Sequence, residues 1–146
     1  MEFTYNYPRM LVTVDTIVFL KDDTNNTHKI LLIQRINNPF HGCYALPGGF
    51  VEMDETLKDA AIRELLEETG LKNVELKQLG AFDKIDRDPR DRNICIAFYG
   101  FTATSNSSVL GGDDAENAQW FDLDSLPSLA FDHSDIIQLA REKLGI

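Results

Sequence analysis

Residues 49–71 read GFVEMDETLKDAAIRELLEETGL, and this stretch decides the fold around it. Thr56 stands directly before a run of apolar residues, and Asp59 follows three positions later, a spacing typical of a helix N-terminus with an acidic first turn. Gly70 is a suitable C-cap, because glycine adopts a left-handed backbone without strain. The stretch therefore predicts a helix between Thr56 and Gly70. Its core-facing residues recur at helical spacing: Leu57, Ala60, Ala61 and Leu65.

Three glutamates gather on this predicted helix. Glu64 and Glu68 are one turn apart on one face, and Glu67 lies beside them at three residues from Glu64. Like charges at this spacing repel, and the C-terminal end of a helix dipole also disfavours carboxylates. A divalent cation against that face would remove both penalties, and oxygen ligands favour Mg²⁺ or Mn²⁺ over zinc. For any one glutamate a solvated acidic face is the simpler interpretation, but the whole pattern indicates a metal site.

As a pattern, the stretch resembles the Nudix box, G-x5-E-x7-R-E-U-x-E-E-x-G-U with U an aliphatic residue, and departs from it nowhere. The resemblance implies an α/β (α+β) fold, the Nudix α/β/α sandwich with a mixed β-sheet between helices. It also implies a metal-dependent hydrolase of nucleoside diphosphates linked to another group. The resemblance gives the Gly48 carbonyl as a metal ligand and an Arg63–Glu55 ion pair that orients the carboxylates. The catalytic metal ligands that it implies are Glu64, Glu67 and Glu68.

The bulk composition is that of one globular domain, here the whole of residues 1–146. Hydrophobic residues make up 43% of the chain and charged residues 26%, which suffices for a single core. The net charge of −10 argues against polymeric nucleic acid as a partner, because phosphate backbones require a basic surface. Cys43 and Cys95 show neither a disulfide framework nor a metal-ligand spacing, so free thiols in a reducing cytoplasm are expected. We see no secretory signal and no apolar run of membrane-spanning length, so no membrane partner is expected.

Outside the box, the residue pattern alternates strands with loops before a second helix. Val-, Ile- and Phe-rich or otherwise extended runs predict strands over these residues: 10–20, 29–35, 44–47, 74–85, 93–104 and 119–122. Apolar residues return to helical spacing over residues 132–144. This order of strands, helix, strands and helix predicts a mixed sheet covered by helices.

Residues around the box narrow the substrate. YALPGGFVE (44–52), together with DRDPR (86–90) followed by a predicted strand, looks like the ADP-ribose pyrophosphatase branch of the family. Pro89 would correspond to a proline of that branch and would hold a loop that presents Arg87, Arg90 and Arg92 to a phosphate-bearing ligand. The alternative is a solvated turn whose arginines pair with the aspartates of the same loop, and the sequence favours neither.

Further candidates for substrate contact and catalysis lie elsewhere. Arg35 ends a predicted strand where related sequences place a phosphate-binding arginine, and a surface ion pair is an equal alternative. Phe50 and Phe82 are candidates for stacking on adenine, although most aromatics at such positions belong to the core. Relatives often carry a catalytic glutamate three residues before the tryptophan, where this chain has Asn117. Because an amide cannot accept a proton as a carboxylate does, Glu116 is the substitute candidate and the general base stays open.

These features predict a small-molecule nucleotide substrate: hydrolysis of ADP-ribose to AMP and ribose 5-phosphate with Mg²⁺ or Mn²⁺. One alternative is a house-cleaning nucleoside triphosphate pyrophosphohydrolase, because the box serves both reactions. Another is a non-catalytic ADP-ribose-sensing module, because LAFDHSDII (129–137) resembles a run found in such sensors. The resemblance also implies a homodimer, for which the aromatic residues Phe3, Tyr5 and Tyr7 are the candidate contact.

Overall fold

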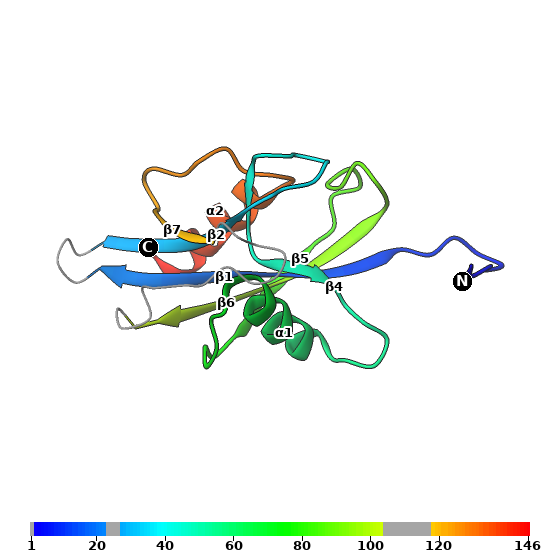
Figure 1. The fold of residues 1–146 in the computed structure, drawn as a ribbon, viewed down its shortest axis with the longest axis horizontal. Coiled ribbons are helices and arrows are strands. Elements are labelled where there is room, and N and C mark those ends of the chain that lie inside the picture. The colour runs from blue at the N-terminus through cyan, green and yellow to red at the C-terminus, as the bar shows by residue number, and fades with distance from the viewer. Residues whose placement is uncertain (1, 23–26, 104–117) are drawn as a thin grey trace.

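The computed structural model describes residues 2–22, 27–103 and 118–146, and these contain seven strands and two helices (Figure 1). In chain order they are β1 (Leu11–Asp22), β2 (Thr27–Gln34), β3 (Tyr44–Ala45), β4 (Gly48–Phe50), α1 (Leu57–Thr69), β5 (Lys77–Phe82), β6 (Asn93–Thr102), β7 (Gln119–Asp122) and α2 (His133–Leu144).

Strand β1 organises the sheet. Along one edge it pairs with β6 in parallel, with Leu11 opposite Asn93 at the start. The other edge of β1 is shared, because β4 pairs with its N-terminal part, Asp15 opposite Gly48, and β2 pairs with its C-terminal part, both antiparallel. The strand order is β3-β2-β1-β6-β5, with β4 on β1 and β7 on β2. The sheet is therefore mixed, as predicted, and β4 brings the 49–71 stretch to its middle.

The two helices cover opposite faces of the sheet (Figure 1). Because side chains of a strand alternate between faces, Val14 and Val18 of β1 belong to the core under α1, whereas Ile17 and Phe19 belong to the core under α2. The helices complete these clusters with Ala60, Ala61 and Leu65 from α1, and Ile136, Ile137 and Ala140 from α2. The predicted helix–sheet–helix sandwich is confirmed.

Helix α1 begins and ends where the sequence predicts. The Thr56 hydroxyl accepts a hydrogen bond from the Asp59 backbone N–H at 3.1 Å, which makes Thr56 the N-cap. Gly70 has φ 76°, and its N–H donates to the Leu66 carbonyl at 2.9 Å. Local capping chemistry therefore fixes both ends of the helix that carries the three glutamates.

Most predicted strands are found with ends shifted by one or two residues, and two larger differences stand out. The extended segment after α1 is shorter, since only Lys77–Phe82 pairs as β5. The sequence predicts no strand over residues 48–50, but these residues form β4 and pair with β1. A Cβ on Gly48 would overlap the Val14 carbonyl and the Asp15 side chain, so glycine is required there by the approach of two strands.

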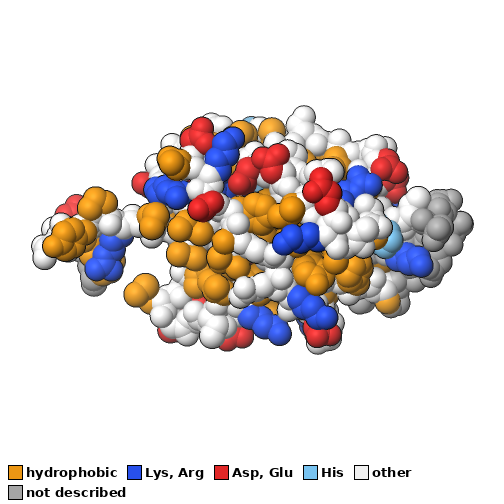
Figure 2. Space-filling model, turned by 180° about the vertical axis from the view of Figure 1, so that it is seen from behind, with side chains coloured by type: hydrophobic (Ala, Val, Ile, Leu, Met, Phe, Trp, Pro, Cys, Tyr) orange, Lys and Arg blue, Asp and Glu red, His pale blue; other side chains and the backbone are white. Residues whose placement is uncertain are grey.

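The N-terminal segment projects from the body of the molecule (Figures 1 and 2). Its aromatic side chains are uncovered, with Phe3 70% and Tyr7 80% exposed. Figure 2 shows further apolar side chains on the rear face among charged groups of both signs. Neither helix of the described ranges has the length and apolar character to span a bilayer.

Candidate active site

Arg63 organises the acidic face of α1. Its Nε and Nη2 donate to the two Glu55 oxygens at 2.9 and 2.6 Å, and its Nη1 reaches Glu64 at 2.8 Å and Glu67 at 3.2 Å. The hydrogen bonds from Arg63 lower the pKa of Glu55 to about 2, and the same contact raises the pKa of Arg63. The predicted Arg63–Glu55 pair is therefore present. In addition, this arginine supplies part of the positive charge that the glutamates require.

Glu68 is the carboxyl that Arg63 does not reach. Its side chain is buried, and its Oε1 accepts a hydrogen bond from the Gly48 N–H at 2.8 Å. Burial raises the pKa of Glu68 to about 9; the Gly48 hydrogen bond opposes this rise, whereas the nearby Glu64 and Asp15 carboxylates reinforce it. Burial also raises the pKa of Glu64, against the opposing effect of Arg63. Across the described residues no ion pair includes Glu68, so the ionised form of this carboxyl has no salt-bridge partner there.

Strand β4 and the glutamates of α1 face each other closely. A Cβ on Gly49 would lie 2.5 Å from Glu64 Oε1, so the Glu64 carboxylate rests on the Gly49 backbone. Glu67 differs from the other two glutamates, because its side chain is 53% exposed and pairs with Arg63. Within the described ranges, no three His, Cys, Asp or Glu side chains converge as a finished metal-ligand group. The two carboxyl groups that contact the β4 backbone are therefore those of Glu64 and Glu68.

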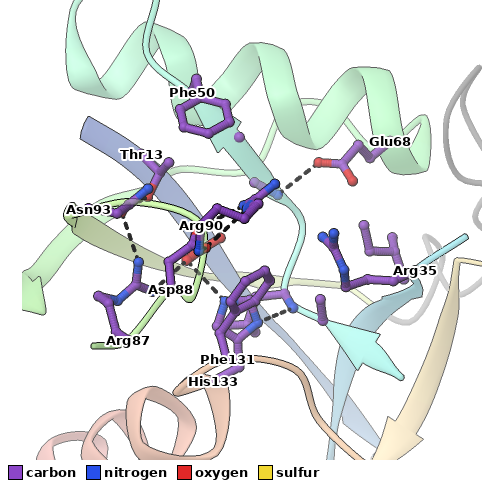
Figure 3. A pocket seen from close by; sticks show the side chains of 16 residues that line it. Thr13, Arg35, Phe50, Glu68, Arg87, Asp88, Arg90, Asn93, Phe131 and His133 are labelled. Carbon is purple, nitrogen blue, oxygen red and sulfur yellow. Dashed lines mark hydrogen bonds and ion pairs between the residues drawn. The ribbon is translucent and has the colours of Figure 1, made fainter. Parts of the chain in front are cut away.

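A cavity of about 180 Å³ opens beside Glu68. Figure 3 shows Glu68 and Phe50 on the α1 side of this cavity, with Arg87, Phe131 and His133 on the other side. Its mouth carries two guanidinium groups. The Arg35 guanidinium carbon lies 5.0 Å from the centre of the Phe131 ring, and that of Arg90 lies 5.6 Å from the same ring. Glu68, with Glu64 beside it on the same face of α1, forms what we call the acidic wall, and Arg35, Arg90 and Phe131 lie across the cavity from Glu68.

Arg35 and Arg90 have different anchors. Arg35 Nε donates to the Pro39 carbonyl at 2.8 Å, and burial, then repulsion from Arg90, lowers the pKa of Arg35. Arg90 pairs with Asp88 of its own loop at 3.0 and 2.8 Å, as the solvated-turn alternative predicted, yet it also lines the cavity. Phe50 joins them, 45% exposed, with its ring 5.9 Å from the Arg90 guanidinium carbon.

Arg87 fits neither alternative that the sequence left open. It is buried and donates twice to Asp132, at 3.0 and 2.8 Å, and once to Asn93 at 2.9 Å. Although Arg87 lines the cavity floor, its partners come from β6 and the start of α2, not from its own loop. The correction has a simple cause: a buried guanidinium requires a buried carboxylate, and the one that Arg87 contacts, Asp132, lies 45 residues away in the sequence.

The remaining predicted site residues either do not line the cavity or lie outside the residues that the structure describes. Phe82 packs partly buried against the core under α2 and does not line the cavity. Pro89 is exposed and does not line the cavity either. Glu116 and Asn117 lie outside the described residues.

The cavity floor contains polar residues that the sequence patterns did not single out. Asp15 Oδ2 lies 3.2 Å from His133 Nε2 and accepts from the Cys95 thiol at 3.0 Å, while Thr13 donates to Asn93 at 2.9 Å. Burial would raise the pKa of Asp15, but its contacts with His133, Cys95 and the nearby guanidinium hold it below its ordinary value. Asp15 carried a usable signal, because it is the one charged residue in the apolar run LVTVDTIVFL (11–20).

A family model described as NUDIX domain matches residues 12–140. The ADP-ribose pyrophosphatase of Methanocaldococcus jannaschii is 47% identical over 132 residues, 90% of this chain and 73% of that protein. The ADPR responsive transcriptional repressor NtrR of Acinetobacter baylyi is 36% identical over 147 residues, but this chain spans only 56% of its length. The solved NUDIX domain of Shewanella oneidensis NrtR, complexed with ADP ribose, superposes with a TM-score of 0.85 at 31% identity, over 94% of this chain and 90% of that one.

Proposed function

The chain belongs to the Nudix family, and from that premise we propose that it hydrolyses ADP-ribose to AMP and ribose 5-phosphate. The observation that carries the proposal is the opposition of two walls across one cavity. Glu68, which no ion pair of the described residues includes, lies on one side with Glu64 beside it, and Arg35 and Arg90 lie on the other side at the Phe131 ring. A pyrophosphate needs positive charge on both sides, which these arginines and a metal ion would provide.

Nudix hydrolases generally use divalent metal ions, and the residues present fit such an ion. The donors are carboxylate oxygens of Glu64 and Glu68 with the Gly48 backbone beside them, and Glu67 is within reach at the same helix end. This hard-oxygen set suits Mg²⁺ or Mn²⁺, the ions that we propose. When bound, the ion would neutralise pyrophosphate oxygens and lower the pKa of a coordinated water.

The side chains of this chain would bind, orient and accept protons. Arg63 holds Glu55, Glu64 and Glu67 in a fixed arrangement, which positions the acidic wall. Arg35 and Arg90 would donate hydrogen bonds to phosphate oxygens at the mouth. Either a carboxylate of the acidic wall or Glu116 would accept the proton from the attacking water.

The sensing alternative has support of its own, because the repressor relative and the ADP ribose complex are both similar to this chain. The distinguishing experiment combines the purified chain with ADP-ribose and Mg²⁺ or Mn²⁺, and separates the products by chromatography. Release of AMP and ribose 5-phosphate supports the enzyme. Tight ADP-ribose binding without any product would replace it with the sensor, and cleavage of nucleoside triphosphates alone would favour the pyrophosphohydrolase.

The arrangement of the chain in solution is part of the proposal. We propose a single Nudix domain over residues 1–146 that forms a homodimer through the N-terminal segment, on the grounds that Phe3, Tyr5 and Tyr7 are uncovered. Sedimentation of the full chain beside a Tyr5→Ser and Tyr7→Ser double variant tests the dimer, which this variant should weaken. A monomer at every concentration would contradict it.

A further inference from the structure

Three successive residues before and within β4 are held by three different elements. The Leu46 N–H donates to His133 Nδ1 at 3.0 Å, where α2 begins. The Pro47 carbonyl accepts from the Thr16 N–H at 2.8 Å and from the Thr16 hydroxyl at 3.1 Å, both in β1. The Gly48 N–H donates to Glu68 Oε1 in α1. Each residue of the backbone segment from Leu46 to Gly48 therefore has its own hydrogen-bond partner. His133 binds the first of them, Leu46 (Figure 3).

The hydrogen bonds of His133 define its ring state. Because Nδ1 accepts from a backbone N–H, it carries no proton, and the ring proton is on Nε2. Nε2 lies 3.2 Å from Asp15 Oδ2, which is the acceptor for that proton. Asp15 is itself fixed by the Cys95 thiol at 3.0 Å. His133 and Asp15 are 3% and 7% exposed, so both side chains are held in the buried floor of the cavity.

We propose that His133 is a positioning residue for the metal site: through the Leu46 N–H it sets the Leu46–Gly48 backbone that orients Glu68. The inference rests on the proposed function, since it concerns the same metal-binding carboxylates. Without the Nδ1 acceptor, the buried Leu46 N–H would lose its partner, and the backbone would move to find another. The Gly48 N–H would move with it, and Glu68 would lose its one hydrogen bond to that backbone.

A matched pair of variants separates the two hydrogen bonds of the ring. In His133→Asn the amide oxygen takes the place of Nδ1 and keeps an acceptor for Leu46, while the bond to Asp15 is lost. In His133→Gln the amide reaches the place of Nε2 and keeps the bond to Asp15, while the acceptor for Leu46 is lost. Calorimetric titration of each metal-free protein with Mn²⁺, without nucleotide, measures the effect directly.

We expect His133→Gln to bind Mn²⁺ about 10-fold or more weakly than the unmodified chain, in the range seen when outer-shell partners of a metal site are removed. His133→Asn should lose clearly less affinity. Equal Mn²⁺ affinity in all three proteins would overturn the inference and leave the proposed function standing. Equal losses in both variants would make the role of His133 merely structural and overturn it too. An unmodified chain that binds no divalent cation would overturn the proposed function and this inference with it.

A measurement on the unmodified chain covers the case in which His133→Gln does not fold. Long-range ¹H–¹⁵N spectra report which ring nitrogen of His133 carries the proton. The inference requires a bare Nδ1 and a protonated Nε2, and a proton on Nδ1 would overturn it.

Discussion

At the scale of single residues, Glu68 carries the most chemistry. It is the buried acid whose carboxyl accepts the β4 N–H but no guanidinium, so its ionised form is the one that a bound cation would stabilise most. A Glu68→Gln variant keeps an oxygen that can accept from Gly48 and should stay folded. We expect kcat/KM for ADP-ribose to fall by at least about 10²-fold, the usual scale for a lost catalytic carboxylate.

The matched control is Glu75→Gln, an exposed glutamate outside the cavity. It should hydrolyse ADP-ribose at the rate of the unmodified chain. Comparable rates in Glu68→Gln and Glu75→Gln would remove Glu68 from the mechanism.

The raised pKa of Glu68 also predicts a pH dependence of stability in metal-free protein. Its pKa is about 9 in the folded state against an ordinary value of 4.5, so between these values the folded state holds a proton that the unfolded chain has released. The contribution of Glu68 to the free energy of unfolding should therefore be greatest at low pH. It should decline as pH rises towards about 9. Urea unfolding with chelator at several pH values measures it. Glu68→Gln should lack this part of the decline, and an identical pH profile in both proteins would contradict the assignment.

Gly49 tests the packing of β4 against the acidic wall. In Gly49→Ala the new Cβ would press on the movable end of Glu64, at 2.5 Å, so the carboxylate should shift while the fold holds. We expect hydrolysis to fall much more than stability, which should change by about 1 kcal/mol or less. Gly80→Ala in β5 is the control, since a Cβ there meets nothing within 4 Å. Full activity in Gly49→Ala would show that Glu64 does not need its observed position.

At the scale of elements, helix α1 depends on its N-cap as well as on its core face. Thr56→Ala removes the acceptor for the Asp59 N–H and should lower the free energy of unfolding by about 1 kcal/mol. Thr56→Ser keeps the hydroxyl and should lose little of that. Chemical denaturation of both variants measures the difference, and equal stability of the alanine and serine variants would mean that the cap contributes nothing.

The elements also show what the sequence alone could predict. The limits of α1 follow from local chemistry, because Thr56 and Gly70 cap it within the same stretch. Strand β4 could not be predicted in the same way, since its three residues pair with β1 more than thirty positions earlier. The buried partner of Arg87 was missed for the same reason, because Asp132 lies 45 residues away. Local signals place elements, whereas contacts between distant segments finish the site.

At the scale of the whole molecule, Arg87 joins three parts of the chain. Its guanidinium contacts Asp132 before α2 and Asn93 of β6, and lies 3.8 Å from Asp15 of β1. Arg87→Ala would leave buried carboxylates without their partner and should cost about 3–5 kcal/mol of stability. A double variant, Arg87→Met with Asp132→Leu, should recover part of that loss by removing both charges. A milder loss in the single variant than in the double variant would contradict this account.

The central claim is that the carboxylates of α1 hold a divalent cation that the cleavage of a nucleoside diphosphate requires. The most direct measurement follows AMP and ribose 5-phosphate released from ADP-ribose by the purified chain, first with Mg²⁺ or Mn²⁺ and then with excess chelator. We expect both products in the presence of metal, none after chelation, and recovery when metal is restored. Turnover that continues undiminished in chelator would contradict the claim.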